Sequence, residues 1–154
     1  MDTGRVIKEI EKISVKTDCI HILPGVEYEC SVSAENIRDF ASVLYKNNYM
    51  LLYLTAIHLE PYPAVVYQFV WPETKFRIRA VVFCGENKTV PTISDIYNGA
   101  NWYEREVMEF FGIDFDGLED KRTLILDESD KGLYPLLKKE GKALDAEATG
   151  FKTN

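Results

Sequence analysis

The clearest strand in this sequence is residues 64–71, which read Ala-Val-Val-Tyr-Gln-Phe-Val-Trp. Successive side chains of a strand point to opposite faces, and this run places apolar groups on both. Such a run is typical of a strand that is covered on each side. Prolines at positions 63 and 72 bound it, and proline ends strands because it lacks the N–H that a ladder requires. The stretch therefore predicts a central strand.

Two further strands are predicted on either side of it in the sequence, at about residues 49–58 and 75–84. In the later strand, apolar side chains alternate with basic ones, so one face should meet the core and the other should face water or a partner. The apolar set is Phe76, Ile78, Ala80 and Val82, and the basic set is Lys75, Arg77 and Arg79.

The N-terminal half predicts helices and strands in alternation. Apolar residues at helical spacing indicate a short helix over residues 3–13. Two strands, 18–23 and 26–32, flank a Pro-Gly turn. Ser33 is a good N-cap for a second amphipathic helix that ends near residues 47–48. The order up to residue 84 is thus helix, two strands, helix and three strands.

This order predicts an α+β fold, a two-layer domain in which a mixed sheet of about five strands carries helices on one face. A helical and loop segment follows the sheet. It begins with a short helix over residues 92–97, for which Thr92 or Ser94 is the candidate cap. A longer helix follows over 101–111, which Gly112 ends in a left-handed conformation. From residue 113 onward the chain reads as loop.

The domain organisation is predicted to be simple. Residues 1–137 form a single α+β domain, and residues 138–154 form a flexible C-terminal tail, because they are polar and have no periodic apolar face. The longest apolar run is far shorter than the ~20 residues that a spanning helix requires. No signal peptide or lipidation motif is recognisable.

Charge and cysteine usage narrow the possible functions. The chain of 154 residues has a formal net charge of −7 and a pI of about 4.9. Nucleic-acid binding is therefore not expected, and any membrane contact should be indirect, because phosphate groups would repel the acidic surface. The three cysteines form no C-x-x-C pair, which indicates reduced thiols in a cytoplasm.

The sequence contains few motifs that indicate a catalytic or metal-binding site. The two histidines and three cysteines form no metal-ligand spacing, and no glycine-rich phosphate loop or nucleophile elbow is present. Carboxylates gather at Glu104, at Glu106 and within residues 114–120. They could serve a small soluble hydrolase, but Glu104 and Glu106 point to different sides of a helix. Arg105 is instead expected to pair with Glu109, and the carboxylates are interpreted mainly as structural or interface groups.

Residues 90–117 resemble the signature of the 30-kDa-subunit family of NADH dehydrogenase, which is the C subunit of respiratory complex I. That signature has a Pro-Ser/Thr start, then Ala-x-Trp-x-Glu-Arg-Glu, and then Phe-Gly-Ile-x-Phe-x-Gly. The residues in register are Ala100, Trp102, Glu104, Arg105, Glu106, Phe111, Gly112, Ile113, Phe115 and Gly117. The resemblance covers roughly residues 34–137.

The departures from that pattern concern the segment after the signature. Leu118-Glu119 replace the usual His-Pro, the Arg-Arg-Ile-Leu run is reduced to residues 121–124, and the final motif ends Pro-Leu-Leu-Lys at residues 135–138. This shorter form resembles the related subunit of energy-converting, membrane-bound NiFe hydrogenases.

The resemblance implies a cofactor-free structural subunit, not catalytic by itself, on the cytoplasmic side of the cell membrane. Its implied partners are a NiFe-hydrogenase-like large subunit, related to the D-type component of complex I, and an iron–sulfur small subunit, related to the B-type component. A free-standing interaction module remains an alternative. The expected interface residues are Trp102, Glu104, Arg105, Glu106, Phe110, Phe111, Gly112, Phe115, Gly117, Asp120, Arg122 and Pro135. The aromatic members could equally be the domain's own core, and the charged members either meet the partner or fix the loop over residues 112–126.

Overall fold

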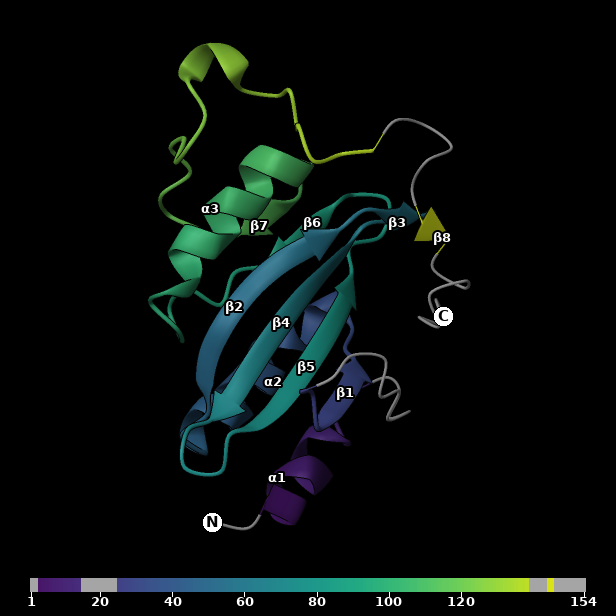
Figure 1. The fold of residues 1–154 in the computed structure, drawn as a ribbon, viewed down its shortest axis with the longest axis vertical. Coiled ribbons are helices and arrows are strands. Elements are labelled where there is room, and N and C mark those ends of the chain that lie inside the picture. The colour runs from purple at the N-terminus through teal and green to yellow at the C-terminus, as the bar shows by residue number, and fades with distance from the viewer. Residues whose placement is uncertain (1–2, 15–24, 139–143, 146–154) are drawn as a thin grey trace.

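The computed structural model describes residues 3–14, 25–138 and 144–145. Its centre is a four-stranded mixed sheet in the order β1-β5-β4-β2 (Figure 1). These strands are β1 (Tyr28–Ser31), β2 (Met50–Ile57), β4 (Ala64–Trp71) and β5 (Phe76–Phe83). The strands β2 and β5 each run antiparallel to β4, and β1 runs parallel to β5.

The strand β4 lies inside the sheet, as its sequence predicted. Val65, Tyr67 and Phe69 point into the main core, whereas Ala64 and Val66 join a smaller apolar cluster on the other face. Both faces of β4 are therefore covered, which explains why apolar residues occupy nearly every position.

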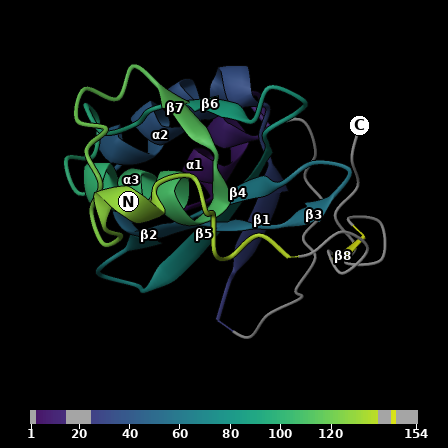
Figure 2. The ribbon, with the colours of Figure 1, turned by 90° about the horizontal axis from the view of Figure 1, so that it is seen from above.

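Helices α1 (Thr3–Ile10) and α2 (Ile37–Lys46) lie on one face of the sheet, so the expected two-layer α+β architecture is confirmed (Figure 2). The short 3₁₀ helix η1 (Ala34–Asn36) precedes α2, and Ser33 occupies its N-cap without a side-chain hydrogen bond. The α2 stripe that the sequence indicated is fully buried, namely Ile37, Phe40, Ala41 and Leu44.

The N-terminal elements differ in part from the prediction. Residues 11–13 form a turn after α1 rather than continuing the helix. The strand predicted at 18–23 lies outside the described residues, as do Cys19 and His21. Within the described residues the main sheet has four strands, against about five predicted.

The C-terminal third contains more strand than predicted. Helix α3 (Ala100–Phe111) confirms the predicted helix over 101–111. The expected helix over residues 92–97 is instead a turn, in which the Tyr97 amide donates to the Ile93 carbonyl. Residues predicted as loop include β7 (Asp114–Asp116), which pairs in parallel with β6 (Thr89–Pro91). Strands of three residues are too short to leave a periodic pattern.

The rest of the C-terminal segment arcs past the end of α3 (Figure 1). It contains one 3₁₀ turn, η2 (Glu128–Asp130). Residues 144–145 form β8, which pairs with β3 (Leu59–Glu60), while most of the predicted tail lies outside the described residues. In the described ranges, no helix is long and apolar enough to cross a membrane.

The basic face predicted on β5 is not uniformly wet. Arg79 is buried and forms an ion pair of 2.9 Å with Glu29 on β1. Lys75 lies in the turn before the strand, and Arg77 pairs with Glu27 at 3.6 Å. The expectation that this face meets water or a partner is therefore wrong for Arg79, because the sequence could not show that carboxylates in and just before β1 would lie beside the arginines.

The end of α3 depends on glycine. Gly112 has φ 67°, and a Cβ there would lie 3.0 Å from the Tyr134 ring. We expect Gly112→Ala to lower the free energy of unfolding by about 1–2 kcal/mol, because it adds backbone strain and a clash. Denaturant unfolding measures this change. Gly99→Ala is the matched control, since it has ordinary φ and no atom within 4 Å. A loss at Gly99 as large as that at Gly112 would contradict the prediction.

Candidate functional site

The side chain of Glu104 ties α3 to the turn that follows β6. It is fully buried, its Oε1 accepts the Ile93 amide at 2.9 Å, and its Oε2 accepts the Thr92 hydroxyl at 2.5 Å. Burial raises the pKa of Glu104, and the bonds from Thr92 and Ile93 offset part of that rise. Both carboxylate oxygens are thus occupied by the protein's own donors.

A second tie holds the same turn from the side of α2. The Arg38 guanidinium donates to the Thr92 carbonyl at 2.5 Å and to both Asp95 oxygens, at 2.8 and 2.6 Å. The hydrogen bond from Arg38 lowers the pKa of Asp95. The turn is therefore clamped between two helices.

The exposed part of this clamp should contribute little to stability. We expect Asp95→Asn to lower the free energy of unfolding by no more than about 1 kcal/mol, since exposed ion pairs are screened by water. Because the folded pKa of Asp95 is lowered, its contribution is present above pH 3.8 and is lost as the pH falls through the folded value. Unfolding curves of both proteins at several pH values test this. A wild-type advantage that grows as the pH falls below 3.8 would have the wrong sign.

The opposite side of α3 holds the segment after β7 through Arg105. Its Nε donates to the Arg122 carbonyl at 2.9 Å, its Nη2 to the Thr123 carbonyl at 2.9 Å, and its Nη1 to Asp120 at 3.3 Å. The guanidinium also lies 5.5 Å from the centre of the Trp102 ring. A planar group with several donors is well suited to such a junction.

Glu109 continues the same attachment one turn later on α3. Its carboxylate accepts the Leu124 amide and also the amides of Ile125 and Leu126, at 2.9 and 3.4 Å. The predicted Arg105–Glu109 pair is therefore wrong, because both side chains bind backbone of residues 120–126 instead. The i,i+4 spacing signals proximity along a helix, but it cannot reveal a competing loop.

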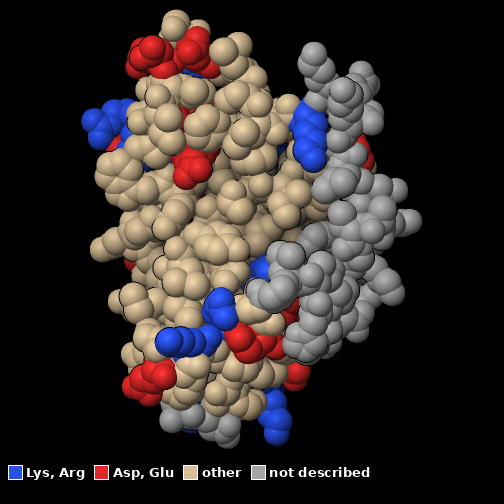
Figure 3. Space-filling view, in the orientation of Figure 1, with Lys and Arg blue, Asp and Glu red and all other residues tan. Residues whose placement is uncertain are grey.

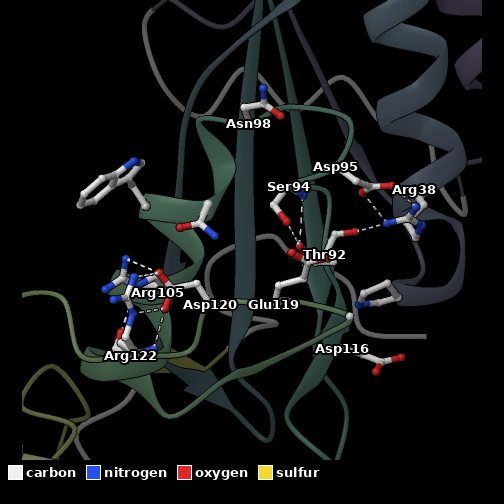
Figure 4. Close-up of a pocket in the computed structure, with 14 residues that line it drawn as sticks. Arg38, Thr92, Ser94, Asp95, Asn98, Arg105, Asp116, Glu119, Asp120 and Arg122 are labelled. Carbon is white, nitrogen blue, oxygen red and sulfur yellow. Dashed lines mark hydrogen bonds and ion pairs between the residues drawn. The ribbon is translucent and has the colours of Figure 1, made fainter.

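An open groove of about 840 Å³ lies between the turn held by Arg38 and the segment held by Arg105 (Figure 4). In Figure 4, Arg105, Asp120 and Arg122 stand along one side of it, with Arg38 and Asp95 on the other. Its remaining lining is Pro91, Thr92, Ser94, Asn98, Asn101, Trp102, Asp116, Gly117 and Glu119. The groove is thus polar, and it lies where the predicted signature residues converge.

The structure separates the predicted interface residues into buried and exposed sets. Trp102 is 61% exposed on α3, and Arg122 and Pro135 are exposed as well. Phe111 and Phe115 belong to the domain's own core. The half-buried members are Glu106, Phe110, Gly112 and Asp120, and Gly117 is an exposed turn residue. An interface role for the exposed members stays a prediction.

The acidic segment offers no obvious metal site. Asp114 pairs with Lys121 at 2.6 Å, and Asp120 holds Arg122 at 2.8 Å. Nowhere in residues 3–14, 25–138 and 144–145 do three or more His, Cys, Asp or Glu side chains gather as metal ligands would. Cys30 and Cys84 are both buried, and burial raises the pKa of Cys84 to about 12.

Sequence reasoning missed the contribution of α2 to this site. Arg38 and Asp95 are 57 positions apart, and neither belongs to a recognisable motif. The sequence did mark the turn itself, because Thr92 and Ser94 were interpreted as candidate helix caps. In the structure the Thr92 hydroxyl donates to Glu104 and also bonds the Ser94 hydroxyl at 2.8 Å.

The fold and site together define an α+β domain whose third helix anchors two loops beside a polar groove. The chain belongs to the family described as respiratory-chain NADH dehydrogenase, 30 Kd subunit, which matches residues 30–143. This finding confirms the family that residues 90–117 indicated.

Curated relatives agree with this assignment. The C subunit of NADH-quinone oxidoreductase from Sinorhizobium medicae is 42% identical over 87 residues, which cover 56% of this chain and 40% of that protein. Its counterpart from Ruegeria pomeroyi is 36% identical over 122 residues, covering 73% and 59%. The chain therefore matches only about half the length of these relatives.

Two solved structures share the fold. One is a chain of the membrane-bound sulfane sulfur reductase, an archaeal respiratory membrane complex, with a TM-score of 0.71, 28% identity and coverage of 86% of this chain and 81% of that one. The other is a trypsin-resistant fragment of Nqo5, with a TM-score of 0.60, 23% identity and coverage of 78% and 99%. The Nqo5 likeness concerns the fold alone.

Proposed function

We propose that this chain is a non-catalytic, cofactor-free structural subunit of a complex I-like, membrane-bound oxidoreductase. The observation that carries the proposal is the inward use of the signature groups. The signature residues Glu104 and Arg105, and Glu109 one turn further along α3, all bind the protein's own loops. These three side chains therefore shape a surface, because their polar groups already bind the protein itself.

The proposed partners are a NiFe-hydrogenase-like large subunit and an iron–sulfur small subunit. Support comes from family membership and from the likeness to a chain of an archaeal respiratory membrane complex. The chain would stand on the cytoplasmic side of the membrane and contact it only through its partners. The altered motifs after residue 117 favour the hydrogenase-like branch over an NADH:quinone complex.

The alternative of a carboxylate-dependent hydrolase receives little support. A general base requires a reachable proton and a free lone pair. Glu104 is fully buried beneath Thr92 and Ile93, and Glu106 leaves the helix on a different side. The two carboxylates therefore do not form an acid–base pair.

Capture of the tagged chain from its host's membranes in mild detergent tests the proposal. We expect a NiFe-type large subunit, an iron–sulfur small subunit and membrane-embedded partners among the proteins identified by mass spectrometry. The cysteines of the large subunit would distinguish a hydrogenase from a complex I. Recovery of a soluble, solitary chain would overturn the proposal.

The variant Trp102→Ala tests whether Trp102 lies in the partner interface. Its ring is mostly exposed, so Trp102→Ala should change the free energy of unfolding by less than about 1 kcal/mol. Exposed tryptophans often dominate interfaces, so we expect at least about a tenfold loss of captured partners. Unfolding and capture are measured on the same preparation. Tyr45→Ala, another exposed aromatic, is the control that should retain its partners. Full capture by Trp102→Ala would remove Trp102 from the interface.

A further inference from the structure

The charged side chains that line the groove beside α3 are only partly paired with one another. Three arginines line it, and each is paired with a carboxylate. Arg38 binds Asp95, whereas Arg105 and Arg122 share Asp120. Two carboxylates therefore compensate three arginines, and these paired groups keep one net positive charge.

Two lining carboxylates remain without such compensation. Asp116 at the end of β7 and Glu119 in the following turn are both exposed. Within the described part of the chain, neither side chain forms an ion pair or a hydrogen bond. With these two, the lining has four carboxylates against three arginines, so the groove has a net charge of −1 on a protein whose net charge is −7.

The remaining lining suits a polypeptide better than a small molecule. Small-molecule sites are mostly enclosed and apolar, whereas this groove is open and lined with charged and amide groups. Asn98 and Asn101 offer side-chain amides at the start of α3, and Trp102 adds an exposed ring that attracts cations. Complementary charges across an interface set its specificity and register.

The space-filling view shows how charge is distributed on one face of the molecule. In Figure 3 the middle of that face is largely uncharged, and acidic and basic side chains gather toward its two ends.

We propose that this groove receives a basic, Lys- or Arg-containing segment of a partner protein in the complex. The inference rests on the proposed function, because it names the chemistry of the partner surface. A basic side chain of the segment meets Asp116 or Glu119, and the segment passes beside Trp102. The Arg105 and Glu109 attachments keep the wall of the groove in place.

Charge reversal tests this proposal on the full-length tagged chain. We expect the double variant Asp116→Lys, Glu119→Lys to recover at least about tenfold less partner than wild type, because like charges would then face each other. Glu35→Lys with Glu73→Lys is the matched control, since both are exposed carboxylates outside the groove. It should recover as much partner as wild type.

A neutral double variant separates the effect of charge from an effect on folding. Asp116→Asn with Glu119→Gln keeps the size of both side chains, and thermal unfolding should match wild type. Partner capture by wild type should fall more steeply with salt than capture by this variant, because screening removes the attraction between charges. Equal salt dependence of the two proteins would overturn the inference.

A photo-crosslinking residue in place of Asn98 identifies the segment directly. We expect a crosslinked partner peptide that contains at least one Lys or Arg beside the attachment point. Crosslinking to an acidic or uncharged segment would overturn the inference. If wild type captures partners and the charge-reversed variant captures them equally, the groove proposal fails while the proposed function stands. If wild type captures none, both fail.

Discussion

Replacing Glu104 by alanine is expected to lower the free energy of unfolding by about 3 kcal/mol. The substitution removes the acceptor of the Ile93 amide and the Thr92 hydroxyl and leaves a cavity beneath the turn. Buried donors without acceptors cost about 1–3 kcal/mol each. Denaturant unfolding of the purified chain measures the change. A loss below about 1 kcal/mol would show that the turn does not depend on this side chain.

Glu104→Gln separates the hydrogen bonds from the charge. The amide oxygen can accept the Ile93 amide, and the amide nitrogen can donate to the Thr92 hydroxyl. We therefore expect a loss of only about 1 kcal/mol near neutral pH. A loss as large as that of alanine would mean that the negative charge itself is required.

The two proteins should also differ in pH dependence. Burial raises the pKa of Glu104 above 4.5, so the folded state binds this proton more tightly than the unfolded state. The resulting stabilisation is fully present below pH 4.5 and is lost as the pH rises through the folded pKa. The advantage of wild type over Glu104→Gln should therefore be greatest below pH 4.5. Burial raises the pKa of Glu29 as well, but that group is common to both proteins.

Arg105→Ala is the second large effect, at about 2–3 kcal/mol. Without the guanidinium, the carbonyls of Arg122 and Thr123 lose their donors, and the segment is held from α3 mainly by Glu109. Hydrogen exchange at the amides of residues 124–126 should accelerate, because their attachment opens more often. Unfolding and exchange together measure the effect.

Arg122→Ala is the matched control for Arg105. The Arg122 side chain is 84% exposed and pairs only with Asp120 among the described residues, so its loss should cost much less stability than the loss of Arg105. Equal effects of the two substitutions would contradict the view that burial and backbone bonding give Arg105 its importance.

Much of the sheet and of α3 could be predicted because each has a strong local pattern. The run at 64–71 identified a strand covered on both faces, and Gly112 marked the end of α3 with a left-handed residue. Residues 114–116 could not be predicted as a strand. Their partners are residues 89–91, and three residues carry too little periodicity for the pairing to be inferred from sequence.

The sequence predicted which residues form much of the candidate site, but not how their side chains are arranged. The family motif named Trp102, Glu104 and Arg105, yet it did not show that Glu104 turns toward Thr92 while Arg105 turns toward residues 122–123. Those directions depend on where two loops return to α3. The role of Arg38 could not be predicted, because its contacts form only when α2 lies beside the turn after β6.

The most direct test of a structural rather than catalytic role is the turnover per assembled complex of Glu104→Gln with Glu106→Gln. The donor would be whichever of hydrogen, formate, ferredoxin or NADH the wild-type complex oxidises, and the amount of complex would be measured on the same sample. We predict wild-type turnover per complex, even if less complex assembles. A fully assembled complex that has lost its turnover would contradict the structural role and would make these carboxylates part of the chemistry.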